Sequence, residues 1–232
     1  MAISVIVPVA KEDETWRQLL PDLSVLAKDD EVIIVSSDVP PEHYHGDPAL
    51  RSLTCSVHCI KSENGRAKQL NAGIRSSSRE TLWFLHCDSR VSKESYYSLV
   101  SALEQAPDAL HFFDLRFLDD GPALMFLNDF GVWIRSRIFR LPFGDQGFCI
   151  SRSVLERLGG FCEKAPYGED HLLVWRAHQR AVKVRCVGAP IYTSARRYDS
   201  FGWAHTTVNH LKMTVRQAAP EIFRLLRRRI AL

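Results

Sequence analysis

Along the first hundred positions, two hydrophobic patterns take turns: continuous apolar runs, which predict strands, and apolar residues at helical spacing, which predict helices. Residues 3–9 and 31–35 are unbroken runs rich in β-branched residues, which is typical of parallel strands covered on both faces. Between them, residues 12–27 place tryptophan and leucine at helical spacing and predict a helix. Further patterns predict two strands and the helix between them, over 53–60, 81–86 and 65–77. Strands that alternate with helices predict an α/β fold with a mostly parallel, doubly wound sheet flanked by helices.

The spacing changes beyond residue 107. Apolar runs predict three strands, over 109–117, 147–151 and 183–187. Helical spacing predicts helices over 122–139, 153–158, 169–180 and most of 200–230. Ser153 and Glu156 are spaced as a capping box at a helix start. Because no repeat or low-complexity linker separates the parts, we interpret residues 1–232 as one domain with two halves, 1–106 and 107–232.

Composition narrows the class of protein. With 46% hydrophobic and 25% charged residues, the chain is typical of a globular protein. Its net charge of +3 is too small to predict nucleic-acid binding. The six cysteines are scattered, which favours reduced thiols over a disulfide framework. Residues 1–9 lack the charged start of a signal peptide, and no apolar run is long enough to cross a membrane, so we expect a cytoplasmic protein.

The strand predicted at 81–86 ends on polar residues, His86 and then Asp88. In an open parallel sheet the carboxyl ends of the strands form the crevice where ligands bind, so a carboxylate there can meet a ligand or a metal. Two structural alternatives remain open: Asp88 caps the helix that starts near Ser92, or it belongs to a turn.

The turn after the first strand, VPVAKEDE, contains neither G-x-G-x-x-G nor a P-loop. It cannot hold a pyrophosphate on glycine amides, which argues against hydride transfer with NAD. In NGRAKQLNAGI, residues 64–74, Arg66 and Lys68 lie in the first turn of a predicted helix, where the helix dipole disfavours cations. We therefore expect an anion nearby, and the small residues Asn71 and Gly73 would let a ligand approach the backbone. The alternative is an ordinary solvated amphipathic helix.

Seven motifs in chain order resemble glycosyltransferase family 2 enzymes: ISVIVPV, EVIIV, GRAKQLNAG, LWFLHCDS, GDQGFCISRSVLERLGGF, GED and SARRY. They are most similar to the small bacterial subgroup associated with radical-SAM and selenoprotein-type gene neighbourhoods. That subgroup's pattern includes G-R-A-x-Q-x-N-x-G, F-L-H-A-D-T and S-A-R-R. Each motif alone is weakly specific, but all seven lie in register, and the resemblance runs from residue 3 to about residue 215.

The resemblance implies a GT-A fold, which is Rossmann-like, a nucleotide-diphosphate sugar donor and a divalent cation, Mn²⁺ or Mg²⁺. Residues 1–106 would form the nucleotide-binding half, and 107–232 the acceptor-side half with C-terminal helices. His86 and Asp88 occupy the family's D-x-D positions, which hold the metal and the donor phosphates. Because the first position is a histidine, only Asp88 offers a hard oxygen ligand, and we expect weak cation binding without donor.

Glu169 and Asp170 match the family's E-D motif, whose aspartate is the catalytic base. The predicted helix start would stabilise the carboxylate through its dipole. The resemblance thus implies that Asp170 deprotonates an acceptor hydroxyl, with Glu169 beside it. Gln146 would shape the acceptor side, and Arg196 and Arg197 suit a diphosphate or an anionic acceptor.

The predicted donor-binding residues are Pro8, Val9, Glu12, Ser36, Arg66, Asn71, His86 and Asp88. One departure from the family concerns the nucleotide base. The subgroup's second strand normally ends in an aspartate that contacts the ring, whereas this chain has Ser36 there and Asp38 two residues on. The sequence therefore leaves the preferred base open.

We predict transfer of a sugar from a nucleotide-diphosphate donor to an unknown hydroxyl, with inversion and assistance from a metal; a lipid-linked hydroxyl is one candidate acceptor. Two alternatives are a nucleotidyltransferase and a non-catalytic sugar-nucleotide-binding module. The tail adds a possible partner, because Ile222, Leu225, Leu226 and Arg229 share roughly one helical face that could touch an anionic membrane. Alternatively, a terminal helix packs these apolar residues on the body.

Overall fold

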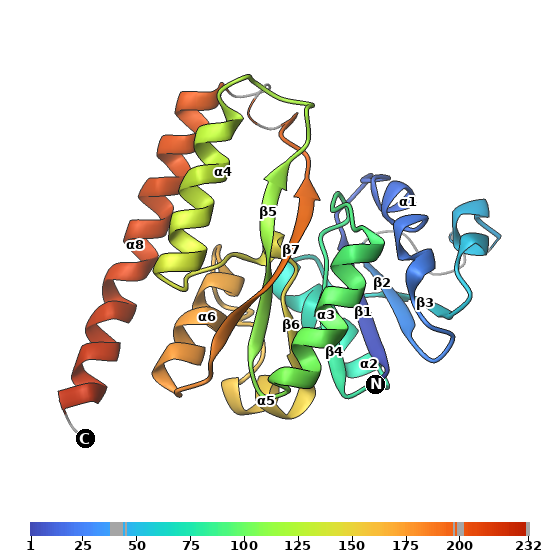
Figure 1. The fold of residues 1–232 in the computed structure, drawn as a ribbon, viewed down its shortest axis with the longest axis horizontal. Coiled ribbons are helices and arrows are strands. Elements are labelled where there is room, and N and C mark those ends of the chain that lie inside the picture. Colours follow the sequence, from blue (N-terminus) through green and yellow to red (C-terminus); the bar gives the residue numbers. More distant parts are fainter. Residues whose placement is uncertain (38–43, 45, 197, 199–201, 231–232) are drawn as a thin grey trace.

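A computed structural model of the chain describes residues 1–37, 44, 46–196, 198 and 202–230, without the side chains of 228–230. Its described strands form one sheet of seven, in the order β3-β2-β1-β4-β6-β5-β7 (Figure 1). The strands are β1 Ile3–Val9, β2 Glu31–Ser36, β3 Ser56–Lys61, β4 Thr81–Phe84, β5 Leu110–Phe117, β6 Cys149–Ser151 and β7 Val184–Thr193. Only β6 runs antiparallel to its neighbours among these seven, so the predicted fold class is confirmed.

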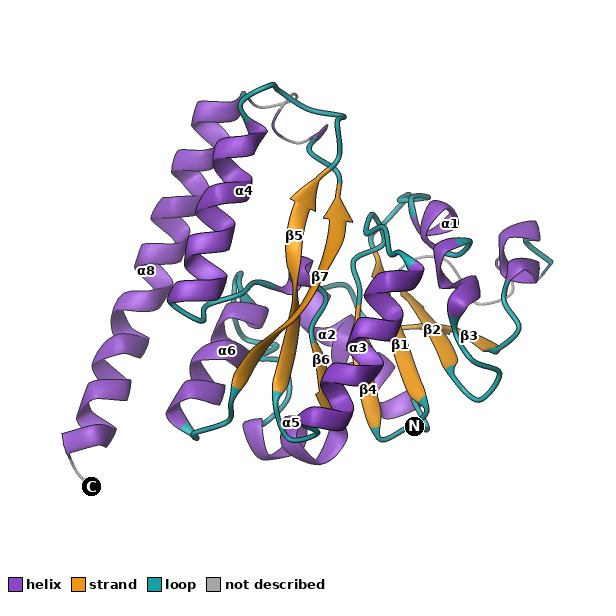
Figure 2. Cartoon of the chain, in the orientation of Figure 1, coloured by secondary structure: helices purple, strands orange, loops and turns teal. Residues whose placement is uncertain are grey.

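Helices cover both faces of the sheet (Figure 2). The longer helices are α2 Arg66–Ser76, α3 Lys93–Gln105, α4 Met125–Trp133, α5 Arg152–Leu158, α6 Glu169–Gln179 and α8 Trp203–Ile230. The short ones are α1 Trp16–Leu19, η1 Asp22–Val25, η3 Pro48–Ser52, η4 Ile134–Ile138 and η5 Gly144–Gln146. Residues of α1, η1 and α3 form one apolar core with the sheet, and residues of α2, α5 and α6 form a second core on its other face.

Burial on both faces explains why β1 and β2 lack polar–apolar alternation. Every residue of both strands is buried, and successive side chains of β1 enter different cores. Val5 and Val7 join the core under α3, whereas Ile6 joins the core under α2. The short third and fourth strands also form where the apolar runs predict them.

The helix predicted over residues 12–27 is wrong in its extent. It is broken into α1 and the 3₁₀ helix η1. Pro21 lies at the break, where proline offers no N–H and its ring disfavours a continuous α-helix. Before the break, Asp13 Oδ1 accepts hydrogen bonds from the amide and the hydroxyl of Thr15, at 2.9 and 2.6 Å. These local bonds hold residues 10–15 as a loop.

Two further boundaries differ from prediction. The capping box of Ser153 and Glu156 is wrong, because α5 begins earlier and Ser151 Oγ caps it by accepting from Val154 N at 3.4 Å. The last strand, predicted over 183–187, continues to Thr193 because β7 pairs with β5 along its full length across a register shift.

The predicted C-terminal helix is confirmed as α8, but its apolar residues do not all face the body. Leu225 is half-buried, whereas Ile222 and Leu226 are 45% and 52% exposed. The alternative that this helix packs all its apolar residues on the body is therefore wrong. The Arg229 side chain lies outside the described residues. Within the described residues, no helix is long and apolar enough to cross a membrane.

Candidate active site

The predicted site residues converge at the edge of the sheet where the strand order reverses. β1 lies between β2 and β4, so the connections that leave β1 and β4 diverge and a crevice opens between them. Val9 ends β1, while His86 and Asp88 follow β4. Cys87 Sγ donates a hydrogen bond of 3.4 Å to Asp13 Oδ2, which joins the loop after β4 to the loop after β1.

Asp88 lies in a tight turn directly after β4. The turn is closed by Ser89 N, which donates to the His86 carbonyl oxygen at 3.1 Å. The next helix, α3, is capped instead by Ser92 Oγ, which accepts from Ser95 N at 3.1 Å. The capping alternative for Asp88 is therefore wrong and the turn is confirmed. In this turn, Asp88 keeps part of its surface exposed.

Arg66 connects two other predicted site residues, Glu169 and His86. It opens α2, and its Nε lies 3.1 Å from Glu169 Oε1 at the start of α6. The same guanidinium contacts His86 Nε2 after β4. We expected an anion near the N-terminus of α2 from the sequence, and Glu169 supplies one. Lys68, in the same turn, pairs with Glu63 at 2.5 Å.

Glu169 and Asp170 are buried in the first turn of α6, at 7% and 9% exposure. Gly168 precedes them with a φ of +64°, a left-handed conformation that glycine adopts at little cost. Burial raises the pKa of Glu169, and the charge of Arg66 opposes that rise only in part. Glu169 Oε1 makes no hydrogen bond within the described residues, so its contact with Arg66 is ionic without aligned hydrogen-bond geometry.

Asp170 accepts backbone hydrogen bonds on both carboxylate oxygens. Oδ2 accepts from Gly144 N at 2.5 Å, and Oδ1 accepts from His171 N at 2.8 Å. Burial alone would raise the pKa of Asp170, but the charge of Arg66 and the two amides outweigh it and bring the pKa below its usual value. Asp170 is therefore a carboxylate at neutral pH and can accept a proton.

The short turn η5 brings the Gly144 amide to Asp170. A Cβ added at Gly144 would lie 2.6 Å from Arg66 Nη2 and 2.8 Å from Asp170 Oδ2. The backbone of this turn therefore touches both charged side chains directly. Glycine is required at Gly144 by this close approach rather than by its own dihedral angles.

Asp145 follows in the same turn. Its Oδ1 is sealed from solvent and makes no hydrogen bond within the described residues, although the residue as a whole keeps partial exposure. Burial raises the pKa of Asp145 to about 6; the charge of Arg135 opposes the rise, and the charges of Asp170 and Asp88 add to it. Asp145 thus shares the crevice with the predicted base and the predicted cation ligand.

Arg135 and Gln146 hold the segment around this turn through contacts with Leu141, Phe143 and Phe113. Arg135 Nη1 donates to Leu141 O at 2.6 Å, and its guanidinium carbon lies 3.5 Å from the centre of the Phe143 ring. Gln146 donates to Phe113 O at 2.9 Å and accepts from Phe143 N at 3.1 Å. Gln146 is fully buried, so its predicted influence on the acceptor side would be one of shape.

The residues predicted to meet the nucleotide base lie in or beside the sheet. Pro8 and Val9 are buried in β1, and the Val9 carbonyl oxygen accepts from Gln69 Nε2 at 2.7 Å. Ser36 is fully buried at the end of β2, and Asp38 lies outside the described residues. Their contact with a base stays a prediction.

The small polar positions of α2 have structural uses. Asn71 Nδ2 donates to Phe161 O at 2.9 Å and to Glu163 Oε1 at 2.8 Å, and Asn71 Oδ1 accepts from Phe161 N at 3.1 Å. A donor contact at Asn71 would have to compete with these bonds. A Cβ at Gly73 would lie 2.5 Å from Ile6 Cγ2, so Gly73 lets α2 pack on β1. The expectation that Gly73 admits a ligand is wrong for this reason.

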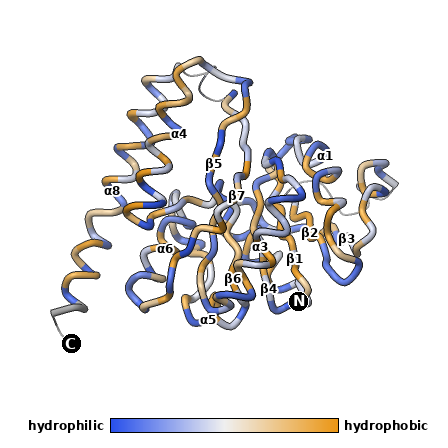
Figure 3. Tube along the Cα trace, viewed as in Figure 1, coloured by the Kyte–Doolittle hydropathy of each residue, from blue (hydrophilic) through white to orange (hydrophobic). Residues whose placement is uncertain are grey.

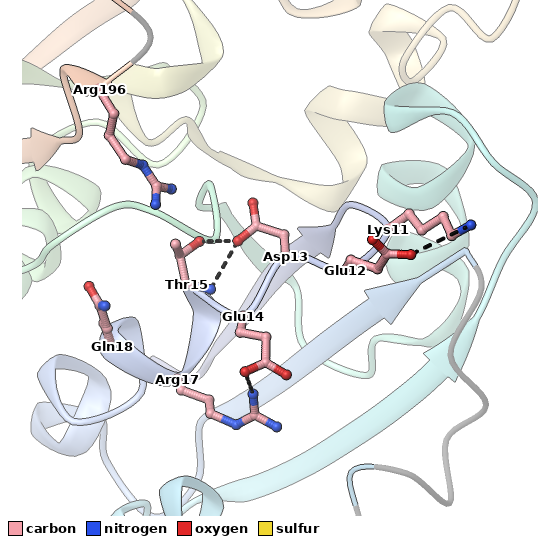
Figure 4. Close-up of a pocket in the computed structure, with 8 residues that line it drawn as sticks. All are labelled: Lys11, Glu12, Asp13, Glu14, Thr15, Arg17, Gln18 and Arg196. Atoms are coloured by element: carbon pink, nitrogen blue, oxygen red, sulfur yellow. Dashed lines mark hydrogen bonds and ion pairs between the residues drawn. The ribbon is translucent and has the colours of Figure 1, made fainter. Parts of the chain in front are cut away.

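An open groove of about 630 Å³ lies beside the crevice, between the loop after β1 and Arg196 (Figure 4). Its lining residues are Lys11, Glu12, Asp13, Glu14, Thr15, Arg17, Gln18 and Arg196. Burial alone would raise the pKa of Asp13, but hydrogen bonds from Thr15 and Cys87 and the charge of Arg196 lower it overall. The predicted residues Glu12 and Arg196 thus border one groove, whereas Arg197 lies outside the described residues.

The crevice supplies some of the oxygen ligands that a divalent cation needs, but not a full set. Asp88 is a partly exposed carboxylate, and Asp145 has a sealed oxygen that lacks a hydrogen-bond partner within the described residues. Across the part of the chain that is described, no three His, Cys, Asp or Glu side chains lie close enough together to hold an ion. A cation would therefore need oxygen ligands from a nucleotide and from water, and weak cation binding without donor stays a prediction.

Several residues of the crevice were missed from the sequence. Asp13, Arg135, Gly144 and Asp145 take part in it, and Gln69 joins the ends of β1 and β2 through bonds to Val9 O and Val35 O, at 2.7 and 2.8 Å. The motif GDQG contains Gly144 and Asp145 and could have indicated both as site residues from the sequence. The position of Arg135, inside an apolar helical segment, gives no such signal.

Residues 4–158 match the family model described as Glycosyl transferase family 2. Because the match covers more than half of the sequence, the chain belongs to this family. Its fold is the GT-A fold that the motifs implied. No curated protein matches the sequence.

Solved structures with a similar fold include proteins of Pyrobaculum calidifontis and S. aureus. The mannosyltransferase PcManGT of Pyrobaculum calidifontis, in complex with GDP-Man and Mn²⁺, has a TM-score of 0.65 and 20% identity, over 98% of this chain and 68% of that one. TarS of S. aureus has a TM-score of 0.64 and 19% identity, over 87% of this chain. Residues 1–349 of TarS in complex with UDP-GlcNAc give 0.62 and 20%, over 84% of this chain. The chain covers only 38% and 58% of these two TarS chains, and the likeness shows the fold alone.

Proposed function

We propose that the chain transfers a sugar from a nucleotide-diphosphate donor to a hydroxyl acceptor, with inversion at the anomeric carbon. The observation that carries the proposal is Asp170, a buried carboxylate that two backbone amides and Arg66 keep ionised. Family membership supports the reaction class. The ligands named for the similar structures, GDP-Man and UDP-GlcNAc, support a nucleotide sugar as donor.

In the proposed reaction, Asp170 takes the proton of the acceptor hydroxyl while that oxygen bonds to the anomeric carbon. The bond from the anomeric carbon to the diphosphate oxygen breaks on the opposite side, and its electron pair leaves with the diphosphate. A divalent cation held at Asp88 would supply positive charge for that leaving group. Arg66 ties α2 to Glu169, so Asp170 stays in a fixed position against the acceptor.

Two alternative classes remain as outcomes of a test. A non-catalytic sugar-nucleotide-binding module would have no need for an ionised, doubly hydrogen-bonded Asp170. A nucleotidyltransferase would need a Gly-rich basic loop after β1, where this chain has Glu12, Asp13 and Glu14.

From the seven motifs in register, we also propose that the chain belongs to the radical-SAM-associated subgroup. We further propose a cytoplasmic location. A lipid-linked acceptor is the acceptor class we favour.

The test begins with nucleoside diphosphate titrations followed by calorimetry, in Mn²⁺ and in EDTA. We expect tighter binding with Mn²⁺, and we expect Asp88→Asn to remove the difference, because Asp88 is the protein's ligand to the cation. Asp29→Asn, which changes an exposed carboxylate outside the crevice, is the matched control. Equal affinity in both buffers would refute the metal role.

A panel of nucleotide sugars then identifies the donor by thermal shift. A ligand at 100 times its Kd stabilises the folded state by about 2.7 kcal/mol, so the correct donor should stand out. Slow hydrolysis of that donor in Mn²⁺ would show catalysis without knowledge of the acceptor. Tight binding with no hydrolysis and no transfer would favour the binding-module alternative.

A further inference from the structure

The long helix α8 packs on the body through polar residues. Gln217 Nε2 donates to the carbonyl oxygens of Tyr167 and Gly168, at 3.0 and 2.9 Å. Glu221 is only 5% exposed and accepts from Gln179 Nε2 at 2.8 Å. An ordinary surface helix turns its apolar side inward. The inward side of α8 is mostly polar instead, with Trp203 and Leu225 half-buried beside the polar residues.

The helix α4 shows the same reversal. Asn128 Oδ1 accepts from Trp203 Nε1 at 2.6 Å, and Asn128 Nδ2 donates to Thr207 Oγ1 at 3.3 Å, so this amide joins α4 to α8. Asp129 Oδ1 accepts from Phe117 N of β5 at 3.2 Å. The polar residues of α4 are therefore used inside the molecule, against the sheet and α8.

Most of the large apolar residues of both helices face outward, whereas Met125, Val132 and Trp203 pack inward. Figure 1 shows α4 and α8 side by side at one end of the molecule, and Figure 3 marks hydrophobic positions along both. Of the sixteen large hydrophobic side chains exposed in the described residues, fourteen belong to this region: Leu124, Phe126, Leu127, Phe130, Trp133, Ile138, Phe139, Val208, Leu211, Met213, Val215, Ile222, Phe223 and Leu226. We call these fourteen the outer surface. Apolar residues gathered in this way indicate an interaction site.

The charges around the outer surface have one sign. Between residues 122 and 141, and between 203 and 230, the only acidic residues are Asp129 and Glu221. Asp129 bonds inward to Phe117 N, and Glu221 bonds inward to Gln179 and also pairs with Arg224 at 2.5 Å. Exposed basic residues lie on α8 among the apolar ones: Lys212, Arg216, Arg224 and Arg227. Apolar residues interleaved with lysine and arginine are typical of helices that lie in the interface of an anionic membrane.

We propose that the outer surface of α4 and α8 docks on a bilayer containing anionic phospholipid, with both helices in the plane of the interface. Charge decides between this partner and a second copy of the chain. A symmetric dimer would bring this surface against its own copy, so Lys212, Arg216 and Arg227 would meet a surface of the same sign, without an outward-facing acid from α4 or α8 to pair them. Anionic headgroups supply that missing charge. The proposal does not depend on the sugar-transfer chemistry.

The fluorescence of Trp133 allows a direct measurement. Trp133 is 46% exposed, whereas Trp16, Trp83 and Trp175 are buried. On vesicles of phosphatidylcholine with phosphatidylglycerol, we expect co-sedimentation at low salt and a blue shift of emission. On phosphatidylcholine alone we expect little of either. Trp133→Phe should still sediment but lose the blue shift, which assigns the signal to the outer surface.

Variants separate the apolar and the electrostatic contributions. Phe130→Gln with Leu211→Gln changes two residues more than 60% exposed, at 61% and 62%, and should weaken vesicle binding about a hundredfold. Lys212→Gln with Arg216→Gln should weaken it about fivefold for each charge removed. Tyr97→Gln is the matched control, because Tyr97 is 63% exposed but lies on α3. It should bind vesicles like the parent.

Three results would overturn the proposal. They are no lipid-dependent sedimentation of the parent at low salt, equal binding with and without anionic lipid, and parent-like binding by Phe130→Gln with Leu211→Gln. A dimer in solution that this double variant converts to monomer, without vesicle binding, would assign the outer surface to a second copy. Circular dichroism verifies the fold of each variant. Nucleoside diphosphate affinity should be unchanged in all of them, so failure here is distinguishable from failure of the proposed function.

Discussion

The crevice around Asp170 and the outer surface of α4 and α8 depart from the usual placement of side chains in opposite ways. The crevice buries ionisable groups, whereas the outer surface exposes apolar groups. In the crevice, Glu169, Asp170 and Asp145 are ionisable groups largely removed from water. On the outer surface, Phe130 and Leu211 are left in water. Each reversal costs free energy, the first through desolvation of charge and the second through hydration of apolar area.

The two regions differ in whether groups within the chain offset this free-energy cost. In the crevice most of it lies within the chain, because Arg66 faces Glu169 and two amides bond Asp170. What remains without a hydrogen bond in the described residues is one oxygen each of Glu169 and Asp145. On the outer surface, no comparable compensation is present among the described residues. Changes in the crevice should therefore alter chemistry and folding stability, whereas changes on the outer surface should alter association.

The largest effect is expected from Asp170→Asn. The amide cannot take a proton, so transfer should fall by about a hundredfold to ten-thousandfold, or about 3 to 5 kcal/mol of barrier. Its NH₂ group would also oppose one of the two N–H donors, from Gly144 or His171, at some cost in stability. Donor affinity should survive. Transfer or donor-hydrolysis rates at saturating donor, together with donor calorimetry, check both expectations.

Glu169→Gln is the companion variant to Asp170→Asn. It removes the ion pair with Arg66 but leaves Asp170 and its two amide donors in place, so its activity should fall less. If Asp170→Asn is active at the parent rate while Glu169→Gln is inactive, the two roles are exchanged. If both variants stay active, the mechanism proposed here is wrong.

A smaller effect is expected from Gly144→Ala. The added methyl would meet Arg66 Nη2 at 2.6 Å and Asp170 Oδ2 at 2.8 Å, so one of these side chains must move. Displacement of a catalytic group by about 1 Å can cost about a hundredfold in rate, and we expect a loss of that order with donor binding retained.

Gly131→Ala, on α4, is the matched control for Gly144→Ala. Apart from its chain neighbours and the backbone of its own helix, no described atom lies within 4 Å of a Cβ added there. A helical glycine replaced by alanine gains about 1 kcal/mol in helix propensity. This variant should be slightly more stable and fully active. Equal activity of the two alanine variants would mean that the contact of Gly144 with Asp170 does not matter for transfer.

The sequence predicts the sheet better than it predicts the crevice. β1 and β2 form where expected because an unbroken β-branched run is a local property of the chain. The prediction of one helix over 12–27 was wrong because Pro21 interrupts the segment, although its apolar residues have helical spacing. Asp88 and Asp170 were found through motifs that are themselves local.

The remaining site residues depend on contacts between distant parts of the chain. Gly144 meets Asp170 across 26 positions, and the contact uses a backbone amide that no side-chain pattern reveals. The orientation of α8 was equally inaccessible from its own spacing. Its polar side faces inward because Gln217 and Glu221 find partners on other elements. Only the folded chain shows that these partners are present.

The smallest effect is expected from Asp145→Asn, and it concerns stability. Burial raises the pKa of Asp145 from 3.8 to about 6, so folding takes up a proton between these pH values. The stability of the parent should therefore fall as pH rises from about 4 to about 6. Asparagine cannot ionise, so Asp145→Asn should lose this decline.

The full pKa shift corresponds to about 3 kcal/mol, and the partial exposure of Asp145 reduces our expectation to about 2 kcal/mol at pH 7.5, with little difference at pH 4. Urea denaturation at several pH values measures it, with Asp119→Asn as the exposed-carboxylate control. An Asp145→Asn variant less stable than the parent at pH 7.5 would show that the carboxylate is satisfied in the folded chain. Among the described residues of the crevice, only Glu169 Oε1 would then lack a hydrogen bond, and the contrast with the outer surface would be sharper, since the exposed apolar groups there would still lack a partner.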